Sequence, residues 1–246
     1  MNEDILYRYD TTGFIDDLKS IHVSLSKRQL CQFLRYYELL VEWNGFMNLT
    51  AITNFDDVMQ KHFVDSLSLA PFFRPESENT MIDIGTGAGF PGLPLKILYP
   101  DLRVTLLDSL NKRIGFLNTV VDELSLTGVE TIHGRAEDFA KAGKLRSSFD
   151  IVVSRAVANL STLSEYCLPF VKTGGMFISF KSEKADEELA HAAHALDLLG
   201  GEVLKVERFM LPSSELSRSL IFVKKIKETP SRFPRKAGLP SKEPLI

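Results

Sequence analysis

The sequence has few cysteines and no long apolar run, and both absences exclude whole classes of protein. The two cysteines, Cys31 and Cys167, are too few among 246 residues for a disulfide framework or a cysteine-based metal cluster. No apolar stretch reaches the length of a membrane-spanning helix, and the acidic start at residues 1–10 lacks the apolar core of a secretory signal. We therefore expect a protein of the reduced cytoplasm, with no membrane and no metal among its partners.

Basic residues are also fewer than acidic ones, and they are concentrated near the C-terminal end of the sequence. The formal net charge is −3, yet residues 224–246 hold seven basic residues and only two acidic ones. The rest of the chain holds 22 basic and 30 acidic residues. A basic tail on an acidic body predicts an anionic partner such as RNA, although a solvated tail with no special role fits the charges equally well.

Glycine is concentrated in one stretch, residues 80–92, which read T-M-I-D-I-G-T-G-A-G-F-P-G. Apolar residues around Asp83 lead into four glycines, Gly85, Gly87, Gly89 and Gly92. Glycine permits positive φ and lets the backbone approach a ligand, and a following helix directs its free N–H groups at that ligand. The stretch therefore predicts a buried strand, a ligand-binding turn and a helix.

Two cofactors are compatible with this turn. Gly87–Gly92 satisfies the dinucleotide fingerprint G-x-G-x-x-G, whereas Asp83–Gly89 matches the D-x-G-x-G-x-G turn of S-adenosylmethionine (SAM) methyltransferases. The dinucleotide interpretation places Pro91, which has no N–H, inside the phosphate-binding turn, while SAM has no pyrophosphate to bind. We therefore favour SAM, and a nicotinamide-binding Rossmann protein remains the alternative.

Strands and helices are predicted to alternate after residue 80. The expected strands are 80–84, 103–108, 129–133, 149–153, 176–180, 202–209 and 219–226, and the expected helices are 91–98, 110–124, 136–142, 159–168 and 183–199. This alternation indicates an α/β fold with a doubly wound, mostly parallel seven-stranded sheet. No helix separates the last two strands, so they must pair antiparallel, as in SAM methyltransferases of class I and unlike most dinucleotide dehydrogenases.

The first part of the chain is predicted to be helical. A short helix is expected around Phe14–Ile21, and an amphipathic helix capped by Ser26 should end near Trp43–Gly45. Asn54 or Asp56 can cap another helix, and 71–79 has the composition of a linker. The chain thus divides into a helical appendage (1–75), a SAM-dependent methyltransferase domain (76–228) and a basic C-terminal tail (229–246).

Polar residues follow the predicted strands at the edge of the sheet where ligands bind. Asp108 can accept both ribose hydroxyls or can simply cap its strand. Ala136, through its N–H, and Glu137 or Asp138, through a carboxylate, can meet an adenine, although these residues also suit an ordinary helix start. Arg155 follows the fourth strand, where a methyl acceptor would approach.

Two further residues lie near this edge in the predicted fold. Lys181 ends the fifth strand and is either a second ligand contact or an exposed strand-end lysine. His62, on an N-terminal helix, is interpreted as structural. The sequence offers no catalytic nucleophile and no catalytic triad, and SAM chemistry requires neither, since the cofactor carries an activated methyl group and the protein mainly supplies alignment.

Several motifs together resemble one bacterial family, RsmG (GidB), the 16S rRNA guanine-N7 methyltransferases. They lie at residues 83–92, 106–113, 133–139, 153–160 and 229–245, with similar segments at 43–52 and 62–67. The resemblance implies that Gly85 and Phe90 line the SAM pocket, with Ala136 and Glu137 at the adenine and Arg155 at the methyl-transfer end.

The resemblance also implies an activity and a partner. The methyl acceptor would be N7 of one guanine in 16S rRNA, in free RNA or in an assembling small ribosomal subunit. A ring nitrogen with a free lone pair needs no general base. The alternative is a SAM-dependent methyltransferase acting on a small molecule or a protein. If the tail binds RNA, removing residues 229–246 should weaken RNA binding and leave SAM affinity nearly intact.

Overall fold

The computed structural model describes residues 3–76 and 78–246, and a seven-stranded sheet forms the centre of this part of the chain. Residues 1, 2 and 77, which belong to the predicted appendage and methyltransferase domain, lie outside the described residues. The strands are β1 (Thr80–Ile84), β2 (Arg103–Asp108), β3 (Val129–His133), β4 (Phe149–Arg155), β5 (Val171–Lys181), β6 (Gly201–Met210) and β7 (Ser217–Lys225).

The strand order confirms the predicted fold class. The sheet runs β3-β2-β1-β4-β5-β7-β6, which means that the chain starts at the centre, winds to one edge and then returns to build the other. Strands β1 to β5 pair in parallel, and β7 pairs antiparallel with both β5 and β6. The carboxyl ends of the five parallel strands therefore meet at one edge.

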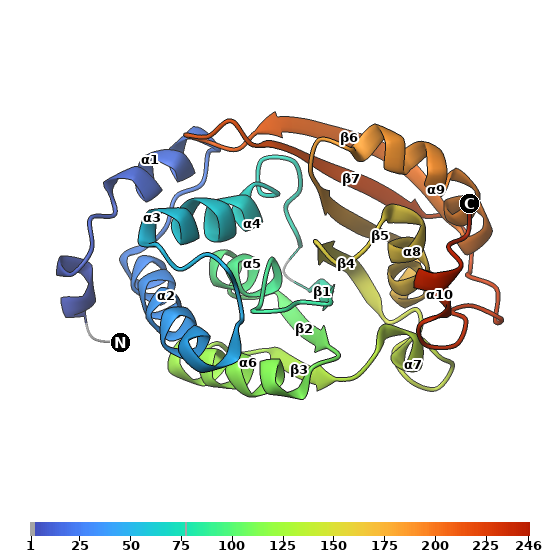
Figure 1. The fold of residues 1–246 in the computed structure, drawn as a ribbon, viewed down its shortest axis with the longest axis horizontal. Helices are drawn as coiled ribbons and strands as arrows, with labels where there is room; N and C mark the ends of the chain where they lie inside the picture. The colour runs from blue at the N-terminus through green and yellow to red at the C-terminus, as the bar shows by residue number, and fades with distance from the viewer. Residues whose placement is uncertain (1–2, 77) are drawn as a thin grey trace.

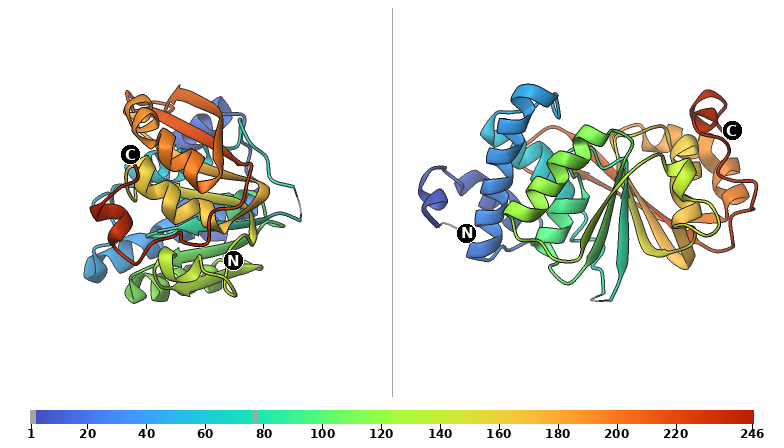
Figure 2. Two further views of the ribbon diagram at one scale, coloured as in Figure 1. Left: turned by 90° about the vertical axis from the view of Figure 1, so that its right-hand side faces the viewer. Right: turned by 90° about the horizontal axis from the view of Figure 1, so that it is seen from below.

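Helices cover both faces of the sheet, and the molecule has three layers (Figures 1 and 2). Before the first strand come η1 (Glu3–Tyr7), α1 (Thr12–Ser20), α2 (Lys27–Met47), α3 (Phe55–Val58), the π-helical η2 (Met59–Val64) and α4 (Asp65–Leu67). The later helices are α5 (Gly92–Leu98), α6 (Asn111–Glu123), α7 (Ala136–Phe139), α8 (Leu160–Cys167), η3 (Leu168–Phe170), α9 (Ala185–Leu199) and α10 (Leu239–Lys242). Among the described helices, none combines the length and the apolar character needed to cross a bilayer.

Each face of the sheet buries its own apolar core, because successive residues of a strand point to opposite sides. On β1, Met81 packs into one core while Ile82 packs into the other. The first core also contains the N-terminal helices, through fully buried Phe33 and Phe63 among others. The second core contains α8 and α9 and, from the tail, buried Phe233. The N-terminal helices and the tail thus lie over opposite faces of the sheet.

Two of the predicted elements differ from the structure for identifiable reasons. Helix α2 continues past the predicted end near Trp43–Gly45 to Met47, where Asn48 adopts a left-handed conformation and terminates it. Strand β5 is longer than predicted, because the pair Gly174–Gly175 lies inside an irregular strand rather than in a turn before it. Near the N-terminus, Ser26 forms the predicted cap with a full capping box.

Candidate functional site

Two cavities adjoin at the carboxyl edge of the parallel strands. The small cavity, of about 230 Å³, lies over the ends of β1, β2 and β3 and reaches the start of α7. The large cavity, of about 700 Å³, lies between the ends of β4 and β5, the start of β7 and the helical segment 61–68. Val157, in the loop after β4, lines both cavities, so an occupant of one would face an occupant of the other across this residue.

The glycine turn after β1 borders the small cavity through Gly85, which lines it. Gly85 and Gly87 adopt φ of 69° and 62°, values that favour glycine. A Cβ on Gly85 would lie 2.6 Å from a methyl group of Val157, so Val157 packs directly against the backbone of this glycine. At the end of the turn, a Cβ on Gly92 would lie 2.6 Å from Leu106, which excludes any larger residue at the start of α5.

Asp83 shapes the turn from inside the protein. Its carboxylate is fully buried, and Oδ2 accepts hydrogen bonds from Thr86 Oγ1 at 2.7 Å and from Gly92 N at 2.8 Å. Its other oxygen, Oδ1, has no partner among the described residues. Burial raises the pKa of Asp83 to about 6, although the two hydrogen bonds oppose the shift. Asp83 therefore holds the turn in place and does not line either cavity.

Asp108, the predicted ribose contact, lines the small cavity and is held from three sides. Its Oδ2 accepts a hydrogen bond from Gly87 N at 2.9 Å, and its Oδ1 accepts one from Leu110 N at 2.9 Å. Arg113, near the start of α6, places NH1 3.2 Å from Oδ2. Sequence reasoning missed Arg113, although a basic residue five positions after a strand-end acid is a usable signal. This network fixes the orientation of the Asp108 carboxylate.

Ala136 and Glu137 both line the small cavity, at the start of α7. Glu137 is only 4% exposed, and its Oε1 accepts a hydrogen bond from Gly238 N, in the tail, at 2.9 Å. Asp138, the other carboxylate considered for this role, pairs with Lys141 at the surface and does not line the cavity. The geometry therefore favours Glu137 as the acid beside an adenine.

Phe90 is placed differently from the expectation that the resemblance raised. Its ring is buried outside the lining of the small cavity and stacks with His62 at a centroid distance of 4.6 Å and with Tyr36 at 5.5 Å. The guanidinium carbon of Arg155 lies 5.0 Å from the centre of the same ring. Phe90 turns toward the N-terminal helices because they offer its apolar ring a buried site. A direct contact of Phe90 with SAM stays a prediction.

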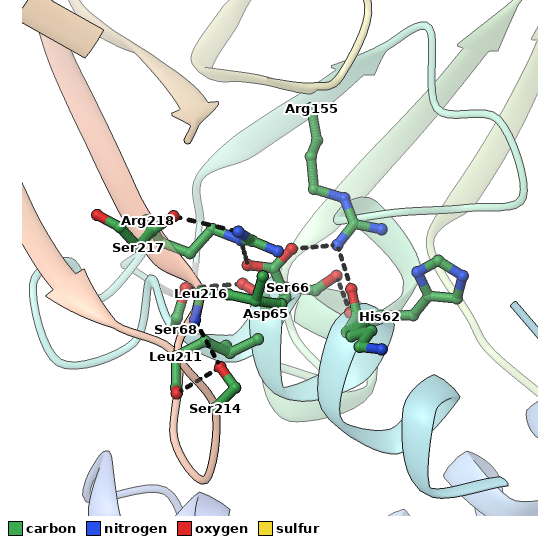
Figure 3. A network of polar contacts seen from close by, with 11 residues as sticks. His62, Asp65, Ser66, Ser68, Arg155, Leu211, Ser214, Leu216, Ser217 and Arg218 are labelled. Carbon is green, nitrogen blue, oxygen red and sulfur yellow. Dashed lines mark hydrogen bonds and ion pairs between the residues drawn. The ribbon is translucent and has the colours of Figure 1, made fainter. Parts of the chain in front are cut away.

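Arg155 lines the large cavity, and an acid that the sequence did not single out holds it there (Figure 3). Asp65, 6% exposed at the start of α4, accepts a hydrogen bond from Arg155 NH1 at 2.9 Å. The same carboxylate accepts a second bond, at 2.8 Å, from Nε of Arg218 on β7. Asp65 thus joins two arginines from separate strands on the wall of the large cavity. The preceding helical turns form a π-helix, a feature frequent at functional sites.

His62 belongs to the same wall and is neutral at neutral pH. Its ring packs on Phe90, and its Nε2 lies 2.9 Å from Thr50 Oγ1. Burial and the nearby positive charge of Arg155 lower the pKa of His62 to about 4. The structural interpretation of His62 fits this packing.

Lys181 is not the exposed strand-end lysine that the sequence allowed. Its side chain is 8% exposed and donates to the Ala158 carbonyl at 2.6 Å and to Glu188 Oε2 at 2.7 Å. Glu188 also accepts a hydrogen bond from Leu160 N at 2.7 Å. Lys181 therefore lines the large cavity and fixes the loop after β4 that separates the two cavities. Within residues 3–76 and 78–246, no three His, Cys, Asp or Glu side chains gather as a metal site.

Solved structures share the fold of this chain. The crystal structure of M. jannaschii TYW2 in complex with AdoMet matches with a TM-score of 0.54 at 15% identity, covering 68% of this chain and 77% of that one. A SAM-dependent methyltransferase from Aquifex aeolicus matches with a TM-score of 0.51 at 18% identity, covering 69% and 93%. The sheet is thus that of the class I SAM-dependent methyltransferases.

Proteins found by sequence comparison have a much higher identity to this chain than these solved structures have. A protein of Lachnoclostridium phytofermentans named ribosomal RNA small subunit methyltransferase G is 54% identical, over 96% of this chain and 98% of its own length. The protein of the same name from Exiguobacterium sp. is 52% identical, over 95% and 98%. The GidB family model, described as rRNA small subunit methyltransferase G, matches residues 29–220. The chain therefore belongs to the GidB family.

Proposed function

We propose that the protein transfers a methyl group from SAM to N7 of a guanine in 16S rRNA, and that it acts in the cytoplasm on free RNA or on an assembling small subunit. The observation that carries this proposal is the pair of adjoining cavities at the carboxyl edge of the sheet. One has the features of an adenosine site, and the other carries an excess of positive charge. The family relatives, named as methyltransferases of small-subunit rRNA, support the same substrate class.

The residues of the small cavity fit SAM. Backbone without Cβ at Gly85, an oriented carboxylate at Asp108 and a second one at Glu137 offer contacts for the amino acid, ribose and adenine parts of the cofactor. Gly87 supports the site by donating its N–H to Asp108, and Ala136 presents its backbone at the start of α7. When bound, SAM supplies an electrophilic methyl group on a sulfonium.

The large cavity suits a nucleotide. Its lining includes four basic residues, Lys61, Arg155, Lys181 and Arg218, against two acids, Asp65 and Glu188. Phosphate groups favour such an excess of positive charge, and guanidinium groups also hydrogen-bond and stack on bases. Since guanine N7 has a free lone pair, the protein has no proton to remove. Its task is to hold the base in line with the methyl group and to exclude water.

The direct test uses small-subunit rRNA from a strain that lacks the gene. Incubation with the protein and SAM should create one 7-methylguanosine, detected by mass spectrometry of the digested RNA. Arg155→Met should lower the methylation rate at least about tenfold, because it removes a charged contact of the large cavity, while the Kd for SAM changes little. Arg208→Met, which removes an exposed ion pair with Asp186, is the matched control and should behave like the wild type.

Two results would contradict the proposal. An RNA digest without the new mark, although the protein binds SAM, would rule out rRNA as the acceptor and favour a small molecule or a protein. A mark at another guanine atom would retain the substrate class and reject N7.

A further inference from the structure

We propose that the basic tail, residues 229–246, is a positioning strap for the small cavity, in which the Gly238 N–H orients the Glu137 carboxylate to recognise the amino group of adenine. The inference rests on the proposed function, because it places the adenosine end of SAM in the small cavity. It also gives the tail a role that differs from the RNA-binding arm suggested by its charge.

The strap is fastened at its beginning by Arg146. This guanidinium donates through NH1 to the carbonyl of Phe233 at 2.7 Å and through NH2 to the carbonyls of Thr229 and Pro230. The Phe233 ring is 5% exposed and packs into the second core, beside α8 and α9. The tail accordingly runs along the face of α8, as the red segment of Figure 1 shows. These contacts make residues 229–234 part of the folded body.

An ion pair with a buried glutamate fastens the middle of the strap. Glu165, on α8, has a side chain only 1% exposed, and its carboxylate accepts from Arg235 NH2 at 2.7 Å and from Arg235 Nε at 3.0 Å. The backbone N–H of Arg235 donates to the same carboxylate at 2.7 Å. One of the basic residues that made the tail look suited to RNA is therefore paired with a buried carboxylate. A half-buried guanidinium with a bidentate partner fixes the path of the chain more than it attracts phosphate.

Three residues further on, the strap reaches the small cavity. Gly238 adopts φ of 82° and donates its N–H to Glu137 Oε1 at 2.9 Å. No donor among residues 3–76 and 78–246 bonds to the other oxygen of Glu137, Oε2, although Glu137 lines the cavity. Beyond Gly238, the carbonyl of Pro240 accepts a bond from Thr162 Oγ1 of α8 at 3.1 Å. The strap thus holds one carboxylate oxygen and leaves the other available to a ligand.

The free oxygen matches adenine in its chemistry. An ionised carboxylate only accepts hydrogen bonds, and the exocyclic amine of adenine donates them. A hypoxanthine ring carries a carbonyl at that position and would face the carboxylate as a second acceptor. A glutamate fixed in one orientation binds the amine without the entropy loss of ordering a free side chain. Gly238 is then a positioning residue, and its loss should reduce the preference for adenine over hypoxanthine.

Calorimetry with S-adenosylhomocysteine and its inosine analogue tests this proposal on the full-length protein. Gly238→Pro removes the N–H donor and, because proline cannot adopt φ of 82°, also displaces the strap at this position. We expect a roughly tenfold higher Kd for the adenosine compound with little change for the inosine compound. Gly238→Ala keeps the N–H and its Cβ meets no neighbour, but a φ of 82° strains alanine, so its loss of affinity should be smaller than that of Gly238→Pro without being zero. Glu137→Gln should abolish the preference. The double variant Lys236→Ala/Lys242→Ala, which removes exposed charges of the tail, should leave both Kd values unchanged.

The outcomes separate this proposal from the one on which it rests. A wild-type protein that does not bind S-adenosylhomocysteine would contradict the proposed function. A wild type that prefers adenine, together with a folded Gly238→Pro that keeps the full preference, would overturn the strap alone. If Gly238→Pro does not fold, Arg235→Met, which releases the strap from Glu165 three residues earlier, decides, and an unchanged adenine preference in that variant overturns the strap. A changed Kd for either compound in the lysine double variant would mean that the exposed positive charge of the tail contributes to binding at the small cavity.

Discussion

Two titratable groups near the turn, the buried Asp83 and the half-buried His62, respond to pH in opposite directions. Burial raises the pKa of Asp83 to about 6, so folding favours its protonated form and stability falls as the pH rises from about 4 to 6. Burial and Arg155 lower the pKa of His62 to about 4, so folding favours its neutral form and stability falls as the pH drops from about 6.5 to 4. At neutral pH the lowered pKa of His62 gives its full contribution to the stability of the folded protein. The ionised carboxylate of Asp83 lowers that stability.

We predict that Asp83→Asn removes the pH dependence due to this carboxylate. The amide oxygen can still accept from Gly92 N and Thr86 Oγ1, while the buried charge is lost. Measured by urea unfolding, the stability of the variant relative to the wild type should rise by up to about 3 kcal/mol between pH 4 and pH 7.

A control is needed for the loss of one carboxylate. Asp16→Asn removes an acid from the exposed surface of α1, where it pairs only with Lys19. Its stability relative to the wild type should vary little over the same pH range. Equal slopes for the two variants would mean that the buried environment of Asp83 does not determine the effect.

At the scale of elements, Lys225 at the end of β7 joins two helical segments. Its buried Nζ donates to the carbonyl of Leu168 at 2.9 Å and to that of Leu199, at the end of α9, at 2.8 Å. Thr229 Oγ1 accepts a further bond from the same ammonium. A lysine at helix carbonyl ends satisfies acceptors that the helices leave free. Burial, with added repulsion from Arg146, nevertheless lowers the pKa of Lys225 to about 7.

The depressed pKa of Lys225 predicts a stability that rises with pH in the alkaline range. Between pH 7 and pH 10 the unfolded chain holds the proton and the folded protein increasingly does not, so the wild type gains stability over that range. Lys225→Met should lack this gain when unfolding is compared at pH 7 and pH 9.5. Lys224→Met, on the other face of β7, should keep it. Parallel profiles of Lys225→Met and the wild type would refute the assignment.

The elements themselves could largely be predicted from sequence, because each has a local signature. Alternating apolar residues marked β1 and β2, and Asn159 and Ser26 occupy the helix starts that the pattern required. The predicted ends of elements were wrong where the conformation depends on packing, as at the irregular start of β5. The glycine turn and the acid after β2 were found for the same reason, since both are short and continuous in sequence.

The sequence also singled out Ala136, Glu137 and Arg155, but the contacts that hold these side chains could not be predicted, because they join distant positions. Asp65 and Arg218 are 153 residues apart, and Glu137 and Gly238 are 101 apart. No periodicity links such pairs, and only the folded sheet brings β7 beside α4 and the tail beside α7. Charge counting suggested either an RNA-binding tail or a solvated one, and composition could not reveal that Arg235 of the tail pairs with Glu165.

At the scale of the whole molecule, the N-terminal helices pack against the glycine turn of the sheet. Tyr36 on α2 is fully buried, its hydroxyl donates to the carbonyl of Ala88 in the glycine turn, and burial raises its pKa well above the usual value. The ring centroids of Phe63 and Phe90 are 5.9 Å apart, which is a second contact between the N-terminal helices and the turn. The predicted division at residue 75 therefore separates segments that share one core.

We predict that the whole chain unfolds in a single cooperative transition, although the N-terminal helices precede the methyltransferase sheet in sequence. Trp43, the only tryptophan of the chain, lies on α2 with its ring 5.7 Å from that of Phe116 on α6, so its fluorescence reports the N-terminal layer. Urea titrations followed by this fluorescence and by circular dichroism should coincide. Phe63→Ala should shift both curves by about 3–5 kcal/mol, whereas Phe46→Ala, at a side chain 67% exposed, should shift neither. Two separate transitions, with only the fluorescence curve moved by Phe63→Ala, would instead establish residues 1–75 as an independent domain.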